Sequence, residues 1–416
     1  MSNPDRTSTP LNRRQFLGDS ARNAATAAAG VVGLSHISQS RASAYSGDIS
    51  KANTVRVGII GLRNQGLELA RVFQHTSGCE ISAICDVDSA VRARAGRELN
   101  LESSKVRSEE DANFLFDDPN LDALVIATPD HHHAWMSAMA ANAGKHLYLE
   151  IPTTHKVEEG ERLQQMLSQT GVLVQVGLQH RSGQHYRSAM EYLHSEELGS
   201  TRYVKAWACV KRQKLISTEK TIPHPLSQHQ QKLWLGPESS CELAGPDWHF
   251  QWRCLWPFGS GELGSWGVPL LDIARWGLQA DMPNRVTATG GSYHLNDGRD
   301  TPDTLHVQYD FPEAAIVWEH RQWTSRGHEG RPHGVAFYGE KGTLIIDRSG
   351  WKVYDSKKSV GQPASKTLEP HVQNFIDAIR QKAPLAADFT TGRISSDFCH
   401  LGNRAFQSGE PISVNA

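Results

Sequence analysis

Residues 121–154 read LDALVIATPDHHHAWMSAMAANAGKHLYLEIPTT, and this stretch decides the fold. An apolar run at 123–127 ends in a Thr-Pro-Asp turn, a run of small residues typical of a helix follows, and a second apolar run ends at 149. Short apolar runs bounded by turn residues indicate buried strands. The stretch therefore predicts a strand–helix–strand unit, the building block of a parallel sheet.

The same alternation extends on both sides of this unit and changes near residue 175. Before that point the pattern is short apolar strands with helices between them, at 55–60, 81–85, 123–127, 146–149 and 172–176, with the first helix at 65–74. After it the predicted strands are longer and alternate apolar with polar residues, at 202–212, 304–311, 315–323, 335–338 and 343–347. Such alternation favours an antiparallel sheet with one covered face. Helical patterns at 371–381 and 392–407 close the chain.

A glycine-rich turn follows the first predicted strand. In the segment GIIGLRNQG, Gly61 and Gly66 occupy the first and third glycine positions of the G-x-G-x-x-G dinucleotide motif, and Arg63 replaces the middle glycine. Asp86 ends the second strand, where a carboxylate accepts from a ribose 2′-hydroxyl and repels a 2′-phosphate. The motif predicts NAD as cofactor, with NADP less favoured. Arg63 either contacts a phosphate directly or points to solvent.

These patterns predict an α/β protein. Its first domain, at 53–175, is a dinucleotide-binding Rossmann domain with a doubly wound parallel sheet. The second, at 176–416, is an α+β substrate and oligomerisation domain with a large, mostly antiparallel open sheet. Residues 213–262 are long, aromatic and irregular, as expected of a site-forming insertion.

The N-terminal residues indicate a signal for export and are not expected to be part of the folded domains. Arg13 and Arg14 precede Gln-Phe-Leu and a weakly apolar stretch, and Ala42-Ser-Ala44 is a cleavage motif. We therefore expect a twin-arginine signal peptide at 1–44, a linker at 45–52 and a periplasmic or otherwise exported protein. The apolar stretch is too short to span a membrane. A net charge of −2 gives no reason to expect nucleic acid as a partner.

Cysteines and histidines offer little support for a disulfide or a metal. The strand between Cys79 and Cys85 is too long for a bridge between them. A bridge among the other four stays open, at Cys209, Cys241, Cys254 and Cys399. The run His131–His133 has no carboxylate or cysteine nearby in the sequence, so no metal site is expected.

The stretch 121–154, ending in Glu150-Ile151-Pro152, resembles the glucose-fructose oxidoreductase / inositol dehydrogenase family of NAD(P)-dependent sugar oxidoreductases. The similarity covers nearly all of the chain after the signal peptide. It implies cofactor contacts from the strand ends at Thr128, Pro129 and Glu150. It also implies a carbohydrate or polyol as substrate, and a homo-oligomer formed through the C-terminal sheet.

The resemblance fails at the catalytic positions. The family carries Lys in Glu-Lys-Pro, and Asp and His in a later Gly-x-Leu-x-Asp-x-Gly-x-His motif. This chain has Ile151, Ser265 and Pro269 at those positions. Oxidation of a carbinol needs a base for the hydroxyl proton and a cation for the developing alkoxide. The ordinary mechanism is therefore not expected unless other residues replace the three.

Replacement candidates come from two regions. His180 is the best remaining base, and Arg181 beside it is expected to contact substrate. His320 lies on an alternating strand and faces opposite its neighbours, toward either the site or solvent. The aromatic insertion offers residues that stack on sugar rings or pack in a core, namely Trp248, His249, Trp252 and Arg253.

Three functions remain open. The first is an exported oxidoreductase that holds NAD tightly and transfers hydride at a ring carbon. The second is a glycosidase that oxidises its substrate transiently, as the resemblance implies for relatives that also carry an apolar residue at the lysine position. The third is a non-catalytic sugar-binding protein on an enzyme scaffold.

Overall fold

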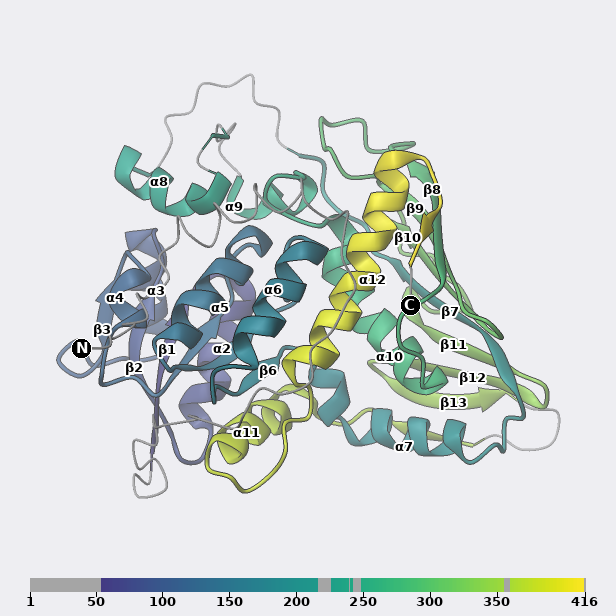
Figure 1. Ribbon diagram of the computed structural model, residues 1–416, viewed down its shortest axis with the longest axis horizontal. Helices are drawn as coiled ribbons and strands as arrows, with labels where there is room; N and C mark the ends of the chain where they lie inside the picture. The colour runs from purple at the N-terminus through teal and green to yellow at the C-terminus, as the bar shows by residue number, and fades with distance from the viewer. Residues whose placement is uncertain (1–53, 216–225, 239, 242–247, 355–359, 415–416) are drawn as a thin grey trace, which may run out of the picture.

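The computed structural model describes residues 54–215, 226–238, 240–241, 248–354 and 360–414. The predicted signal peptide at 1–44 and the linker at 45–52 lie outside these ranges. Two sheets organise the molecule, one in each half, with α12 (Phe389–Ser408) running between them (Figure 1). Within the described ranges, no helix has both the length and the apolarity to cross a membrane.

The first half is a six-stranded parallel sheet with helices on both faces, as predicted. Its strand order is β3-β2-β1-β4-β5-β6, and the order reverses direction at β1. The strands are β1 (Val55–Ile60), β2 (Cys79–Cys85), β3 (Arg107–Glu109), β4 (Ala123–Ile126), β5 (His146–Leu149) and β6 (Val174–Val176). The helices are α2 (Asn64–His75), α3 (Ser89–Glu98), α4 (Asn113–Phe116), α5 (His133–Asn142) and α6 (Val157–Leu167).

Burial explains why these short runs form the centre of the sheet. All four residues of β4 are buried, and five of the six in β1 are buried. Parallel strands covered on both faces read as continuous apolar runs because neither face meets water. Gly58 in β1 leaves room for Leu124 and Leu115, since a side-chain carbon there would lie within about 3 Å of both. The core of this half thus sits directly under the glycine turn.

The second half is a nine-stranded sheet of order β14-β13-β12-β11-β7-β10-β9-β8-β15, antiparallel except where β7 meets β10. This confirms the predicted mostly antiparallel sheet. Its strands are β7 (Thr201–Cys209), β8 (Arg285–Gly291), β9 (Thr304–Asp310), β10 (Ala315–Arg321), β11 (His333–Gly339), β12 (Gly342–Asp347), β13 (Gly350–Tyr354), β14 (Gly361–Pro363) and β15 (Ile412–Ser413).

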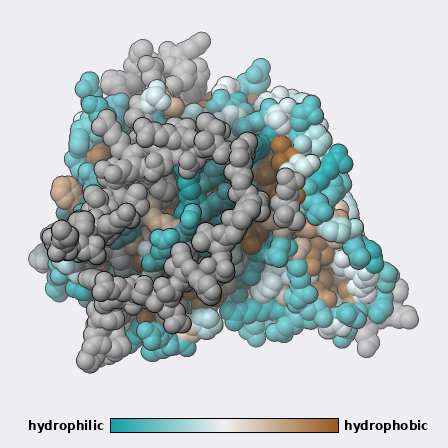
Figure 2. All heavy atoms as spheres, viewed as in Figure 1, coloured by the Kyte–Doolittle hydropathy of each residue, from teal (hydrophilic) through white to brown (hydrophobic). Residues whose placement is uncertain are grey.

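Helices cover one face of this sheet and join it to the first half. They are α7 (Gln184–His194), α10 (Val268–Leu278) and α12, with short turns at η3 (Gln179–Ser182) and η6 (Leu263–Gly267). The helix α11 (Leu368–Ile379) packs instead in the core of the first half. The carboxylate of Asp388 caps α12 by accepting from the Thr391 amide at 2.9 Å. The visible part of this face of the molecule is mostly hydrophilic, with smaller apolar patches right of centre (Figure 2).

The insertion between β7 and η6 lies over the carboxyl ends of the parallel strands. Its described elements are α8 (Gln228–Leu235), η4 (Gly236–Glu238), α9 (Trp248–Gln251) and η5 (Trp252–Cys254). Figure 1 shows α8 and α9 above the first domain, on the side where β1 runs into α2. A small apolar cluster of Leu226, Trp234, Leu235, Trp252 and Phe258 holds the insertion together. The insertion thereby roofs the crevice where ligands bind in doubly wound sheets.

Candidate active site

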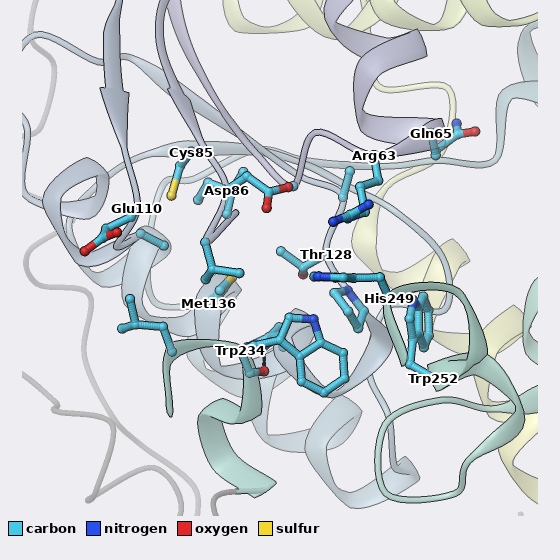
Figure 3. A pocket seen from close by; sticks show the side chains of 18 of the residues that line it. Arg63, Gln65, Cys85, Asp86, Glu110, Thr128, Met136, Trp234, His249 and Trp252 are labelled. Atoms are coloured by element: carbon cyan, nitrogen blue, oxygen red, sulfur yellow. Dashed lines mark hydrogen bonds between the residues drawn. The ribbon is translucent and has the colours of Figure 1, made fainter. Parts of the chain in front are cut away.

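A pocket of about 970 Å³ lies between the first domain and the insertion. Asp86, Arg63 and Thr128 from the first domain face Trp234, His249 and Trp252 from the insertion (Figure 3). The pocket lies at the carboxyl ends of β1, β2 and β4, beside the point where the strand order reverses. This is where open α/β sheets bind their ligands.

The backbone geometry of the turn requires glycine at the first and third glycine positions of the motif. Gly61 has φ +87°, and a side-chain carbon on it would lie 2.6 Å from the Ala127 carbonyl oxygen. A side-chain carbon on Gly66 would lie 1.8 Å from the Gly61 carbonyl oxygen. Both positions therefore admit only glycine. The close turn brings the N-terminus of α2, a favourable end for phosphate, to the pocket wall.

Asp86 lies at the end of β2 and lines the pocket, as the sequence predicted. Its two carboxylate oxygens accept from the backbone amides of Leu62 and Asp88, each at 3.0 Å. Burial raises the pKa of Asp86, and the Leu62 amide opposes the rise. The carboxylate is thus fixed by the glycine turn itself and stays available on its pocket side for a ribose hydroxyl.

The sequence left open whether Arg63 contacts a phosphate or points to solvent, and in the structure its side chain is paired within the protein. Its guanidinium lies 2.6 Å from the Asp88 carboxylate and stacks over the Phe250 ring at 5.7 Å. Its backbone, at φ −89° and ψ 160°, is ordinary extended geometry, so a glycine is not needed there. Arg63 therefore ties the glycine turn to the second strand and to the insertion while still lining the pocket.

The two predicted strand ends differ in their access to the pocket. Thr128 and Pro129 line it, and the Thr128 hydroxyl is buried there without a hydrogen-bond partner among the described residues. Glu150 lies behind the wall, where it accepts from the Gln65 side chain at 3.0 Å and packs against Gly177. Burial raises the pKa of Glu150 to about 7. An orphaned hydroxyl beside the glycine turn fits a bound dinucleotide, because buried polar groups are normally satisfied.

Arg253 of the insertion and Asp130 of the first domain carry opposite charges that attract each other. Arg253 lines the pocket and stacks on the Trp252 ring at 4.1 Å, and within the described residues its guanidinium donates no hydrogen bond. Burial lowers the pKa of Arg253, and the charge of Asp130 opposes the drop. Asp130 accepts from the Ser260 amide at 3.0 Å. Burial raises the pKa of Asp130 to about 7.

The ring nitrogens of the three consecutive histidines contact backbone carbonyl oxygens. His131 and His132 donate to the carbonyl of Trp234 at 3.1 and 2.7 Å. His133 bridges the carbonyls of Pro152 and Thr128 at 2.6 and 3.0 Å. The run therefore joins the insertion to the first domain. The residues that the structure describes contain no cluster of metal-ligating side chains, and the six cysteines carry free thiols.

The three substituted catalytic positions carry no ionisable group and fit their surroundings. Ile151 packs against the main apolar core. Ser265 lies in the π-helical turn η6, and Pro269 lies in the first turn of α10, as predicted. Proline costs little there because the first amides of a helix have no intrahelical partner. These three positions thus fit a regular local backbone without supplying an acid, a base or a cation.

The structure keeps the other predicted site residues away from this pocket. His180 stacks on Tyr186 at 4.6 Å between ring centroids, and burial, reinforced by Arg348, lowers its pKa to about 3. Arg181 is held by Asp272. His320 is buried and faces opposite its neighbours, as predicted, with one ring nitrogen 3.1 Å from the Pro302 carbonyl oxygen.

More of the residues predicted in the insertion line the pocket. Trp252, Arg253 and His249 line the pocket, whereas the side chain of Trp248 lies outside the described part of the chain. Trp234 and Asp130 are additions that the sequence reasoning missed. Asp130 stands in the quoted Thr-Pro-Asp turn and was open to recognition, whereas no spacing marks Trp234 among the eleven tryptophans.

The fold and the pocket are those of an NAD-binding oxidoreductase family. Residues 55–178 match the family described as oxidoreductase family, NAD-binding Rossmann fold, and residues 238–345 match the GFO/IDH/MocA C-terminal domain. The chain belongs to the GFO/IDH/MocA oxidoreductase family.

The curated relatives include proteins named for inositol and glycoside chemistry. One is scyllo-inositol 2-dehydrogenase (NAD(+)) of Bacillus subtilis strain 168, 29% identical over 37% of this chain and 44% of its own length. Another is glycosyl hydrolase family 109 protein 2 of Shewanella sp. strain ANA-3, 35% identical over 27% of this chain and 25% of its own. The chain thus matches less than half the length of these curated relatives.

A solved structure extends the likeness over both domains. Levoglucosan dehydrogenase in complex with NADH and levoglucosan superposes with a TM-score of 0.66 at 18% identity, covering 87% of this chain and 100% of the other. Similarity at this identity shows a shared fold.

Proposed function

We propose that this protein is an NAD-dependent oxidoreductase that acts on a carbohydrate or polyol and transfers hydride at a ring carbon. The observation that carries this proposal is the pocket itself, where the glycine turn, Asp86 and the unpartnered Thr128 hydroxyl converge. A nicotinamide dinucleotide, when bound, supplies the hydride acceptor. The relatives that act on inositol and levoglucosan support the substrate class.

Asp86 supports NAD over NADP. Its carboxylate is held in place by two backbone amides and lines the pocket. A 2′-phosphate would have to approach this fixed negative charge in a partly dry site, where repulsion is weakly screened.

Arg253 takes the place of the missing cation in this proposal. It is the lining guanidinium that has no carboxylate bound to it, since Arg63 is paired with Asp88. Arginine stays protonated in proteins. Its five donors can hold an oxyanion, whether a phosphate oxygen of the cofactor or the developing alkoxide of the substrate.

Asp130 takes the place of the missing base, in preference to His180. A side-chain carbon on Gly264 would lie 3.7 Å from an Asp130 carboxylate oxygen, so the carboxyl group stands next to the backbone position before Ser265. Its pKa of about 7 suits a group that accepts and returns a proton near neutral pH. The pKa of His180, about 3, makes that ring a poor proton acceptor.

The first experiment asks what the protein carries. Purified protein is denatured and the released nucleotide is identified by mass spectrometry. We expect NAD(H), retained because the insertion roofs the pocket. An empty site that also fails to bind added NAD(H) or NADP(H) would overturn the enzymatic proposal.

The second experiment tests the two assigned groups. Turnover on a panel of neutral sugars and polyols is followed for the wild type, Asp130→Asn, Arg253→Ala and His180→Ala. We expect losses of about 10²-fold or more for the first two and little change for His180→Ala. Brisk turnover in Asp130→Asn would remove Asp130 from the mechanism. Bound nucleotide without turnover on any sugar would favour a non-catalytic sugar-binding protein.

A glycosidase is the second candidate function. The Shewanella relative is named as a glycosyl hydrolase, and this chain carries an apolar residue at the lysine position. In such a reaction the substrate is oxidised to a ketone and the aglycone is eliminated. Water then adds to the resulting double bond and the carbonyl is reduced again, so the dinucleotide returns to its starting state. Release of p-nitrophenol from nitrophenyl glycosides without accumulation of NADH identifies this activity.

We also propose that residues 1–44 direct export through the twin-arginine route. The support is the Arg13-Arg14 pair followed by Ala42-Ser-Ala44. This route carries folded proteins, which suits an enzyme loaded with its nucleotide before export. Replacing both arginines with lysine should trap the full-length chain inside the cell, and N-terminal sequencing of exported protein should begin after Ala44.

Finally, we propose a homo-oligomer formed through the nine-stranded sheet, by resemblance to the family. Light scattering coupled to size-exclusion chromatography tests this directly. A monomer at all concentrations would overturn it.

A further inference from the structure

A second cavity lies on the α12 side of the molecule, separate from the nucleotide pocket. It opens between the first turn of α6 and the last turns of α12, and the loop at 256–260 closes one side. Figure 1 shows α6 beside α12, with the upper end of α6 below α9. The lining side chains include His155, Trp256, Ser260, His400, Asn403 and Arg404. None of the residues assigned to the nucleotide site lines it.

One buried polar atom in this cavity has no hydrogen-bond partner among the described residues. It is Nε2 of His400, in a residue 7% exposed. Leaving a buried donor or acceptor unpaired is costly. Such an atom on the wall of a cavity indicates a place where a ligand supplies the missing hydrogen bond.

The other polar groups of the wall are neutral. One ring nitrogen of His155 lies 3.4 Å from the Gly259 carbonyl oxygen, and the Asn403 amide donates to the Ser260 carbonyl at 2.9 Å. Burial lowers the pKa of His155 to about 3 and that of His400 to about 4. Both imidazoles are therefore uncharged near neutral pH, and each offers a donor and an acceptor.

The charges at the rim are paired. Lys156 lies 4.0 Å from Glu238, and Arg404 lies 3.6 Å from Glu158. This leaves no net positive field to select an anion. Trp256 adds an aromatic surface to the wall. Uncharged donors and acceptors beside an aromatic ring match a molecule with hydroxyls on its edge and C–H groups on its face.

We propose that this cavity binds a neutral cyclic polyol or a single monosaccharide unit, at a site distinct from the nucleotide pocket. Ser260 connects the two sites, because it lines the cavity and its backbone amide donates to Asp130. The proposal does not rest on the proposed function, since it needs neither bound nucleotide nor turnover.

The experiment is a crystal soak with myo-inositol, paired with calorimetric titration of the same polyol in solution. We expect density for the ring in the cavity, with a hydroxyl within about 2.7–3.2 Å of the His400 ring nitrogen. Trp256→Ala and His400→Ala should each weaken this binding by about tenfold or more. His75→Ala, an exposed histidine at the end of α2, is the matched control and should leave it unchanged.

Several outcomes would overturn the proposal. They are water alone in the cavity at saturating myo-inositol, inorganic phosphate binding there in preference to the polyol, or equal affinity in both variants and the wild type. If His400→Ala fails to fold, Trp256→Ala and the soak still decide. Arg253→Ala separates this proposal from the proposed function, because it should abolish turnover and leave binding in the cavity intact.

Discussion

The Asp272 carboxylate accepts two hydrogen bonds from the Arg181 guanidinium, each 2.8 Å long, where the two halves of the molecule meet. Asp272 also accepts from the Ser395 hydroxyl on α12 at 2.7 Å and lies 3.4 Å from Arg275. Arg181 and Arg275 hold the pKa of Asp272 below its usual value, despite the burial that would raise it. One carboxylate thereby joins η3, α10 and α12.

This network predicts a stability effect rather than a binding effect for Asp272→Asn. Neutralising a buried partner leaves cationic groups uncompensated, which costs about 3–5 kcal/mol. We expect the melting temperature to fall by several degrees, measured by circular dichroism. Glu369→Gln is the control, since the Lys366–Glu369 pair is exposed and contributes at most about 1 kcal/mol. Equal melting temperatures for the two variants would contradict the prediction.

We predict that Asp86 favours NAD over NADP. In Asp86→Ser we expect NADH affinity to fall by about tenfold, through loss of a charge-assisted hydrogen bond, while NADPH affinity falls less or rises. Fluorescence titration with each reduced dinucleotide measures both. The decisive quantity is the ratio of NADH affinity to NADPH affinity. An unchanged ratio in Asp86→Ser would contradict the role of Asp86 in choosing between the two.

Arg63 and Arg253 should differ sharply although both line the pocket. Arg63 is already paired with Asp88, so Arg63→Ala should change NADH affinity or turnover by less than about fivefold. Arg253 has no hydrogen-bonded partner among the described residues, so Arg253→Ala should cost more than tenfold in one of these two quantities. The reverse order would show that the guanidinium of Arg63 leaves Asp88 when nucleotide binds.

Asp130 makes stability depend on pH in a defined direction. Its pKa is raised from 3.8 to about 7 in the folded protein, so the folded state binds more protons than the unfolded state between these values. The protonated carboxyl group therefore stabilises the folded state. This contribution is complete below about pH 3.8 and is lost as the pH rises to about 7. Asp130→Asn has no carboxyl group to ionise at this position. Its free energy of unfolding should therefore rise relative to that of the wild type, by at most about 4 kcal/mol, as the pH rises from 4 to 8. Urea unfolding at pH 5 and pH 8.5 measures the difference.

The three substituted positions predict a gain of function. Placing Lys at Ile151, Asp at Ser265 and His at Pro269 restores the family's acid, base and cation. We expect net dehydrogenase activity on a polyol to rise by about 10²-fold or more. Formation of NADH measures it, and the three single variants serve as controls. No gain in a folded, NAD-binding triple variant would mean that other features of the cleft limit the reaction.

Local patterns determined most of the fold. The runs at 55–60 and 146–149 match β1 and β5 to the residue because buried parallel strands are continuously apolar. By contrast, β14 and β15 have two or three residues each, too few to show any periodicity. The predicted strand at 202–212 stops at Cys209, and Arg212 beyond it pairs with Glu262.

The sequence by itself determined the nucleotide turn, the family, and the loss of three ionisable groups, because each is written in a few adjacent residues. Only the tertiary structure decided which partners the charged side chains have. Arg63 pairs with Asp88, and Arg181 pairs with Asp272. Asp130 accepts from the amide of Ser260, 130 residues away. Burial sets those choices, since a desolvated charge must find a partner or change its protonation, and that cost depends on neighbours brought together by folding.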